Sequence, residues 1–156
     1  MIALASTTAR AIEPRDRTYY CTPEAVGGVR YDEQLKKWRS ANFRPSGNFV
    51  LKLQYVSSRK DRMFSGADES TVHEFKVTVT EAGSSKELPC TNMRDYKLPI
   101  SVWPDGWVLC SASLSEYKFS PANNRYLAAY LVGFVDGTDN NEDTPSIAVG
   151  VCTKIN

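Results

Sequence analysis

The feature that most constrains the fold of this chain is an alternation of apolar and polar side chains with a period of two. In residues 49–55 the odd positions are Phe, Leu, Leu and Tyr, and Lys52 and Gln54 stand between them. Residues 73–81 repeat the pattern, with Phe and Val on one side and Lys and Thr on the other. Successive side chains of a strand point to opposite faces, so this period predicts strands with one buried and one wet face.

Other segments rich in apolar, β-branched or aromatic residues are bounded by turn-forming residues. These further strand candidates are 17–21, 37–43, 98–103, 107–112, 116–119, 125–135 and 146–154. Helix is expected only at 32–37, and 57–71 is expected to be a mobile surface loop. Short strands separated by turns predict an all-β fold of about 8–10 strands, a single-domain antiparallel barrel or sandwich with little helix.

Turn-forming residues predict two hairpins. In 98–112, Pro104 presets φ for a turn and Gly106 tolerates positive φ, so the two halves are expected to pair. Asn123-Asn124 predicts a second hairpin between the strands on either side of it. A further turn is expected at Gly27-Gly28.

Segment 125–135 is apolar on both faces and leaves two interpretations open. Tyr126, Tyr130 and Phe134 recur every four residues, as on one side of a helix of about three turns. The aromatic and β-branched content of the segment and its late glycine favour a central strand instead.

Four cysteines stand far apart, and no CxxC pair is present. Zinc ligands usually come in close pairs, so two disulfides are favoured over a metal site. Three pairings are possible, and we favour Cys21–Cys152 because a compact β domain often brings its first and last strands together. That choice leaves Cys90–Cys110 as the second bridge. Four reduced thiols in a cytosolic protein remain the alternative.

The N-terminal residues resemble the end of an export signal. Residues 1–11 are small and apolar, and Ala9-Arg10-Ala11 has the small-x-small form that precedes signal-peptidase cleavage, but a basic n-region is missing. The segment is therefore either the tail of a longer signal peptide or a disordered N-terminus. We expect residues 1–15 to lie outside the folded body and 16–156 to form one β domain.

Composition argues against several classes of function. The chain has 19 Lys and Arg against 18 Asp and Glu, a balance that argues against nucleic-acid or anionic-membrane partners. No stretch approaches the roughly 20 apolar residues of a membrane span. His73 is the only histidine and G-x-S-x-G is absent, so no catalytic residue and no cofactor is predicted.

Two weak sites can be named. Asp136, Asp139, Glu142 and Asp143 supply the carboxylates of a calcium loop, but the spacing departs from that of an EF-hand, and a solvated turn is the simpler interpretation. Among the aromatic residues, Trp103, Trp107 and Tyr130 are candidates to line a ligand pocket, although such side chains more often fill a core. Trp103 and Trp107 are expected to face each other across the 98–112 hairpin.

Two patches of sequence resemble a known group of proteins. The first runs from Cys21-Thr22-Pro23 through Gly27 to Asp32, Lys36-Lys37-Trp38 and Phe43, and the second joins Asp143-Thr144-Pro145-Ser146 to Gly150-Val151-Cys152. Together they resemble small exported bacterial proteins without an assigned activity. The resemblance spans about residues 18–156. It implies export and an all-β fold, and it carries over no functional residue.

These observations lead to an expected function. We expect a periplasmic or secreted binding or interaction domain, not an enzyme, whose partner is a small molecule or an envelope protein. The alternative is a carboxylate-dependent hydrolase of envelope glycans, which requires two facing acidic groups in a cleft. A structural envelope component is the second alternative, which predicts an exposed apolar patch or edge strand and no pocket.

Overall fold

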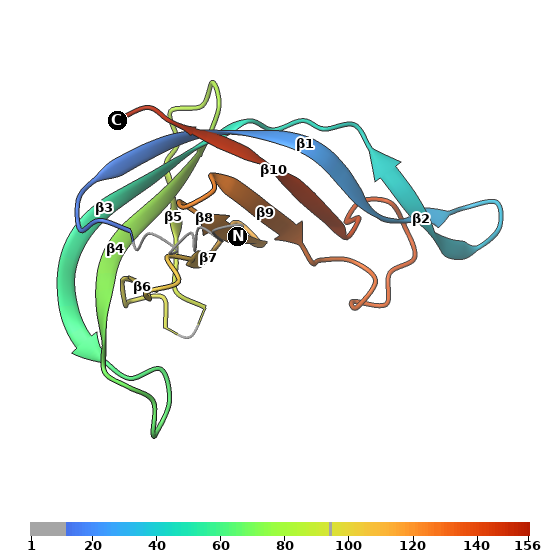
Figure 1. The fold of residues 1–156 in the computed structure, drawn as a ribbon. Helices are drawn as coiled ribbons and strands as arrows, with labels where there is room; N and C mark the ends of the chain where they lie inside the picture. The colour runs from blue at the N-terminus through green and yellow to red at the C-terminus, as the bar shows by residue number, and fades with distance from the viewer. Residues whose placement is uncertain (1–11, 94) are drawn as a thin grey trace, which may run out of the picture.

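A computed structural model describes residues 12–93 and 95–156. Its ten strands form one strongly curved antiparallel sheet in the order β5-β4-β3-β1-β10-β9-β8-β7, with β2 beside β1 and β6 beside β4 (Figure 1). The strands are β1 (Arg17–Asp32), β2 (Lys37–Phe43), β3 (Phe49–Asp61), β4 (Ser70–Glu81), β5 (Leu88–Cys90), β6 (Ile100–Val102), β7 (Val108–Ala112), β8 (Ser115–Ser120), β9 (Arg125–Tyr130) and β10 (Ser146–Lys154). The predicted all-β antiparallel class is confirmed. The sheet is not closed into a barrel, and no helix occurs in the described residues.

Strand β1 is central to the sheet, because it pairs with three other strands. One edge pairs with β10 from Tyr19 to Gly28, and the other edge pairs first with β3 and then with β2. The turn predicted at Gly27-Gly28 is therefore wrong, because both glycines lie inside β1. Gly28 serves a close approach: a Cβ there would stand 2.2 Å from the carbonyl oxygen of Pro145.

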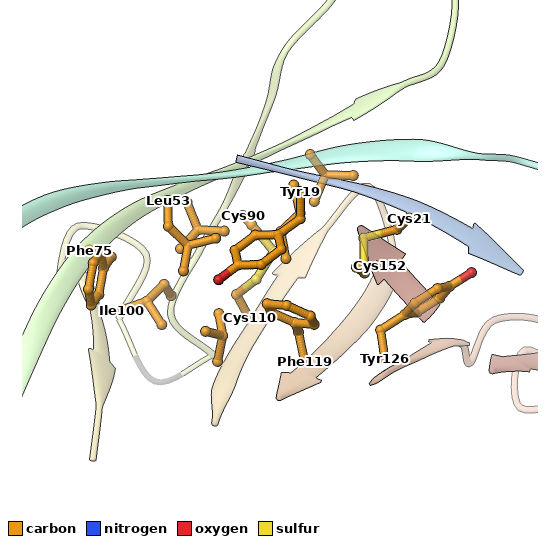
Figure 2. Packing of buried hydrophobic residues seen from close by; sticks show 14 of the residues in the cluster. Tyr19, Cys21, Leu53, Phe75, Cys90, Ile100, Cys110, Phe119, Tyr126 and Cys152 are labelled. Atoms are coloured by element: carbon orange, nitrogen blue, oxygen red, sulfur yellow. A yellow bond between two sulfur atoms is a disulfide. The ribbon is translucent and has the colours of Figure 1, made fainter. Parts of the chain in front are cut away.

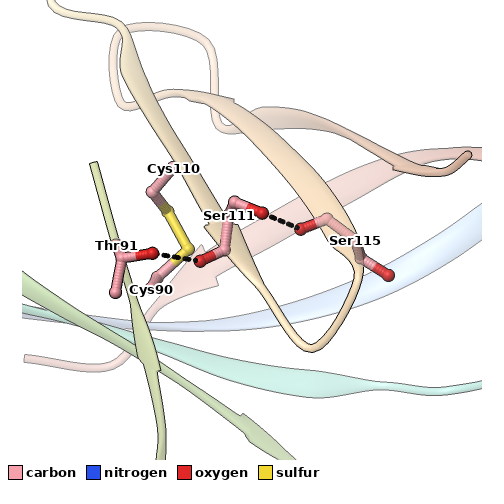
Figure 3. The surroundings of a disulfide bond; sticks show 5 residues. All are labelled: Cys90, Thr91, Cys110, Ser111 and Ser115. Atoms are coloured by element: carbon pink, nitrogen blue, oxygen red, sulfur yellow. Dashed lines mark hydrogen bonds between the residues drawn. A yellow bond between two sulfur atoms is a disulfide. The ribbon is translucent and has the colours of Figure 1, made fainter. Parts of the chain in front are cut away.

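The two ends of the curved sheet are joined at a seam between β5 and β7. Thr91 and Ser111 exchange two backbone hydrogen bonds of 2.8 and 2.9 Å, and the Cys90–Cys110 disulfide lies beside them (Figure 3). The side chain of Thr91 adds a bond to the carbonyl of Ser111, whose hydroxyl donates to the carbonyl of Ser115. One bridge and one disulfide thus replace the continuous ladder that would close a barrel.

The second disulfide, Cys21–Cys152, joins residues that face each other in the β1–β10 register. Both disulfides have the pairing that the sequence favours. All four sulfurs belong to the hydrophobic core on the concave side of the sheet, so the covalent links are buried (Figure 2).

The core fills the concavity with the inward face of each alternating strand. Tyr19, Leu53 and Phe75 converge there with Ile100 and Phe119, and the Tyr19 and Phe119 rings meet edge to face at 4.7 Å (Figure 2). The apolar positions of the period-two pattern are the buried ones, whereas Gln54 and Lys76 point outward. Burial of this single face is the main favourable contribution to folding.

The hairpin predicted at 98–112 does not form. Its turn exists, since Gly106 donates to the carbonyl of Trp103 at 2.8 Å and has a φ of 76°. Beyond the turn, however, β6 pairs with β4 and β7 pairs with β8. Turn chemistry reverses the chain locally, but the backbone of β6 pairs with β4, where Ile100 is the register partner of Phe75.

The hairpin at Asn123-Asn124 is confirmed, with β8 paired to β9 and Asn124 at a φ of 58°. Segment 125–135 is a strand and not a helix, but it ends at Tyr130, because neither β8 nor β10 extends beyond that residue to pair with it. The apolar side chains that follow are exposed, with Val135 at 89%.

Three further expectations need correction. Residues 33–36 form a turn between β1 and β2 instead of a helix. The loop expected at 57–71 shrinks to 62–69, because β3 and β4 continue as a long hairpin that projects from the body (Figure 1). Ile12 is buried in the core, so the folded body begins before residue 16. Residues 1–11, where the signal-like segment falls, lie outside the described part of the chain.

Replacing Gly28 with alanine tests the close approach of β1 to Pro145. We expect Gly28→Ala to lower the free energy of unfolding by about 1–3 kcal/mol, because the backbone has to shift to admit the new Cβ. Gly27→Ala is the matched control, since a Cβ there meets only the carbonyl of Ala41 at 3.9 Å. Chemical denaturation of both variants gives the comparison, and equal stabilities would contradict this account of Gly28.

Removing each disulfide separately tests what the two links contribute. In the chain-entropy model Cys21→Ala/Cys152→Ala costs about 5 kcal/mol and Cys90→Ala/Cys110→Ala about 3 kcal/mol, since the closed loops differ in length. The sequence separations are 131 and 20 residues. Denaturant midpoints of the two double variants measure the difference. A larger loss from the shorter loop would show that the seam depends on more than loop closure.

Candidate binding cleft

A cleft of 340 Å³ opens on the concave face at the end of the sheet where β9 ends and β10 begins. Its walls come from the middle of β1, the end of β2, the 44–48 connection, the start of β3, the strands β8, β9 and β10, and Thr144. We call it the tyrosine cleft. The side chains that define it are Phe43, Arg44, Phe49, Ser115, Tyr117, Tyr126, Ala128, Tyr130, Thr144, Ser146 and Ala148. Ligand pockets of small molecules begin at roughly this size.

A hollow exists here because small residues oppose each other in the middle of the wall. Ala128 of β9 and Ala148 of β10 are register partners, and both line the cleft. Large rings stand on either side, since Tyr126 and Tyr130 point to the same face as Ala128. A β-bulge at Pro23/Ala25 changes which side chains of β1 face inward, so that Pro23 and then Val26 line the cleft.

The floor of the tyrosine cleft is a cluster of three rings. Phe49 contacts Tyr117 with centroids 5.5 Å apart and Tyr126 with centroids 5.0 Å apart, both edge to face. Gly150 makes room for Tyr126, because a Cβ at that position would stand 2.7 Å from the ring. The aromatic floor is therefore packed from behind and does not depend on a ligand for its shape.

The tyrosine hydroxyls of the cleft stay protonated well above neutral pH. Burial raises the pKa of Tyr126 to about 12, with smaller contributions from Tyr117 and the carboxylate of Glu24. Burial also raises the pKa of Tyr117. The pKa of Tyr130 is raised by the hydrogen bond that its hydroxyl donates to Asp143. The cleft thus presents neutral hydroxyl groups that donate and accept hydrogen bonds.

Among the described residues that line the cleft, Arg44 alone carries a charge. It follows β2 directly and is exposed at the rim, where it forms no ion pair or hydrogen bond with a described residue. Among the described residues no carboxylate lines the cleft, although Asp143 accepts the hydrogen bond from Tyr130, and Glu24 and Glu81 lie near enough to affect the other tyrosines. The lining is consequently aromatic and hydroxylated, with one free cation at its mouth.

The three predicted ligand-binding residues do not lie in one site. Tyr130 lines the tyrosine cleft, whereas Trp103 and Trp107 do not. Trp107 lies under the ammonium of Lys118, which stands 4.0 Å from the ring centroid, and the expected meeting of the two tryptophans is not supported because β6 and β7 do not pair. Aromatic content alone could not tell these positions apart.

The predicted calcium ligands do not converge on one point. Within 12–93 and 95–156 no three acidic, histidine or cysteine side chains are close enough to hold an ion. Asp136 accepts a bond from the backbone of Thr138, Asp139 accepts from the indole of Trp38, and Asp143 accepts from Tyr130. Glu142 contributes only its backbone N–H, which donates to the side chain of Asn140.

Asn141, in the same segment, forms with its side chain the hydrogen bonds that a neighbouring strand would form with its backbone. Its carboxamide accepts from the N–H of Tyr31 and donates to the carbonyl of Tyr31, both at 2.9 Å. A neighbouring strand would satisfy the same two groups, and β10 does not reach this part of β1. Asp139, Asn141 and Asp143 thus hold this loop in place against β2, β1 and β9 respectively.

His73 lies in a separate polar cluster on the β3–β4 hairpin. Its Nδ1 is 2.7 Å from the hydroxyl of Ser58, which also bonds the hydroxyl of Tyr55 at 2.8 Å. The neighbouring Glu74 accepts from Ser57 and Arg59, and these bonds lower its pKa. No carboxylate hydrogen-bonds to His73, so the arrangement lacks the orienting acid of a nucleophilic triad.

Apart from Tyr130, the cleft residues were not singled out by the sequence; they include Phe43, Arg44, Phe49, Tyr117, Tyr126, Ala128 and Ala148. One signal was present in the sequence, because the inward positions of 125–130 alternate between tyrosine and alanine. Large residues flanking a small one on the same face of a strand leave a notch. Ala148 faces Ala128 across this notch, and that pairing could be identified only once the β9–β10 register was known.

Alkaline titration tests the buried position of the Tyr126 hydroxyl. Between pH 10 and 12 the unfolded chain releases this proton before the folded chain does, so the stability held below pH 10 is lost as the pH rises. We expect Tyr126→Phe to flatten the fall in denaturation midpoint across this window. Midpoints at pH 9, 10 and 11 for wild type and variant, with Tyr20→Phe as an exposed control, measure the effect; parallel curves would contradict it.

No family model, no curated protein and no solved structure matches this chain. The resemblance to small exported bacterial proteins therefore stays an expectation from the sequence. The described residues contain no helix long and apolar enough to cross a bilayer.

Proposed function

We propose that the protein is a non-enzymatic binding domain that takes up a small organic ligand in the tyrosine cleft. The observation that carries this proposal is a hollow built by the Ala128–Ala148 pair over a packed aromatic floor. Two facing alanines between tyrosines leave space that costs packing energy. A ligand that fills this space recovers the lost contacts.

The compartment that fits this proposal is a periplasm or the outside of a cell. Two disulfides, both buried, persist in oxidising surroundings and are rare in the cytosol. Export also agrees with the signal-like residues 1–11. In such a compartment a binding domain has direct access to ligands outside the cytosol, and binding alone requires no cofactor.

The hydrolase alternative finds no supporting geometry. Two buried acidic groups facing each other across a cleft are its requirement, and no charged residue within the described ranges is buried. Asp143 is half-buried and accepts a hydrogen bond from Tyr130, but Glu24 and Glu81, the other described carboxylates that act on the cleft tyrosines, are both exposed, so neither supplies a buried acid opposite it.

A structural envelope role is favoured by one observation. The outward face of β10 carries Ile147, Val149 and Val151, which are between 38% and 46% exposed, and Leu127 of β9 lies opposite Val149. Such an apolar stripe is what an assembly surface predicts. The same alternative predicts no pocket, however, and the tyrosine cleft weighs against it.

Filling the notch tests the proposed binding function. Ala128→Trp places a large ring in the cleft and should abolish the thermal stabilisation that small-molecule and saccharide libraries give to the wild type. Ala25→Trp is the matched control, because it adds the same side chain at an exposed position of β1. Differential scanning fluorimetry of the three proteins measures the shifts. The proposal falls if no compound stabilises the wild type, or if Ala128→Trp responds equally.

A further inference from the structure

We infer that the ligand of the tyrosine cleft is a saccharide that carries a carboxylate, with its ring on the cleft tyrosines and its acid on Arg44. This inference rests on the proposed binding function and names the chemical class of its ligand. Three observations carry it: the half-exposed rings, the hydroxyl side chains between them, and the unpaired guanidinium at the rim.

The rings suit the faces of a sugar. Phe43, Tyr117 and Tyr130 line the cleft and are only partly buried, so each keeps ring surface available to a ligand. The C–H groups on one side of a pyranose form a flat apolar face that packs on an aromatic ring, while its hydroxyls point to the edges. The packed Phe49–Tyr126 pair behind these rings holds the platform in position.

The hydroxyl groups argue against a hydrocarbon ligand. Besides the tyrosines, the lining includes Ser46, Ser115, Thr144 and Ser146. An acyl chain in the cleft would remove these groups from water without offering them a hydrogen bond, at a cost for each group. A polyhydroxylated ligand exchanges bonds to water for bonds to these side chains, so the same lining favours it.

The guanidinium of Arg44 is the reason to expect a ligand with a carboxylate. It is the only lining side chain with a charge, and no described carboxylate pairs with it. A guanidinium binds a carboxylate through two parallel hydrogen bonds, which gives orientation as well as affinity. A nucleotide would also stack on the rings, but its phosphates call for several cations, and the cleft has one.

Calorimetric titration with acidic oligosaccharides and their neutral methyl esters tests the inference. The probes are oligomers of galacturonate, of mannuronate, and of glucuronate with N-acetylglucosamine. We expect at least one acid to bind the wild type about 10-fold or more tightly than its ester, as a charge-assisted pair provides. Arg44→Gln should bring the two affinities together, Arg44→Lys should keep part of the difference, and Arg62→Gln, an exposed arginine on the β3–β4 loop, should change nothing.

The outcomes separate this inference from the function on which it rests. Equal binding of acid and ester with no effect of Arg44→Gln overturns the role of the acid. If no saccharide binds, but other small molecules bind the wild type and not Ala128→Trp, the saccharide class is overturned and the binding function stays intact. If no compound of any class binds the wild type, both fall. Circular dichroism of the Arg44 variants checks that they keep the wild-type fold.

Discussion

The pairing of β1 with β10 is the constraint on which the rest of the structure depends. These strands lie at the two ends of the folded chain, and their register is held by nine Cα pairs and by the Cys21–Cys152 disulfide. β3 and β2 add to the free edge of β1, and β9, β8 and β7 follow from β10. Because closing so long a loop costs entropy, a covalent link at this position stabilises every contact that forms across it.

Local pattern was a good guide to the elements of this fold. The period of two in 49–55 and 73–81 predicts strands whose inward residues are the buried ones, and the structure bears this out. The Asn123-Asn124 hairpin followed from turn chemistry, since its flanking strands are neighbours in sequence and in space. Where consecutive strands also pair, local signals are sufficient.

The failures arise where distant contacts override local signals. Gly27-Gly28 has the composition of a turn, yet it lies inside a strand because Pro145 approaches its backbone from far along the chain. The turn at Pro104–Gly106 is present, but β6 pairs with β4, whose Phe75 packs beside it. The cleft could not be predicted from the sequence for the same reason: Ala128 and Ala148 form a hollow only when β9 and β10 are paired in this register.

The two walls of the cleft are secured in different ways. The β8–β9–β10 wall consists of uninterrupted ladders, so it opens only if the sheet comes apart. The segment that leads from β9 to Thr144 contributes Thr144 to the cleft and is attached to the β1–β2 hairpin by the Asn141 carboxamide, by the bond from Trp38 to Asp139 and by the edge-to-face contact of the Phe134 and Trp38 rings. Because side-chain bonds of this kind break individually, this wall has a lower free energy of local opening than its opposite. The β8–β9–β10 side of the cleft is thus fixed by continuous backbone pairing, whereas the Thr144 side is fixed by a few separate side-chain contacts.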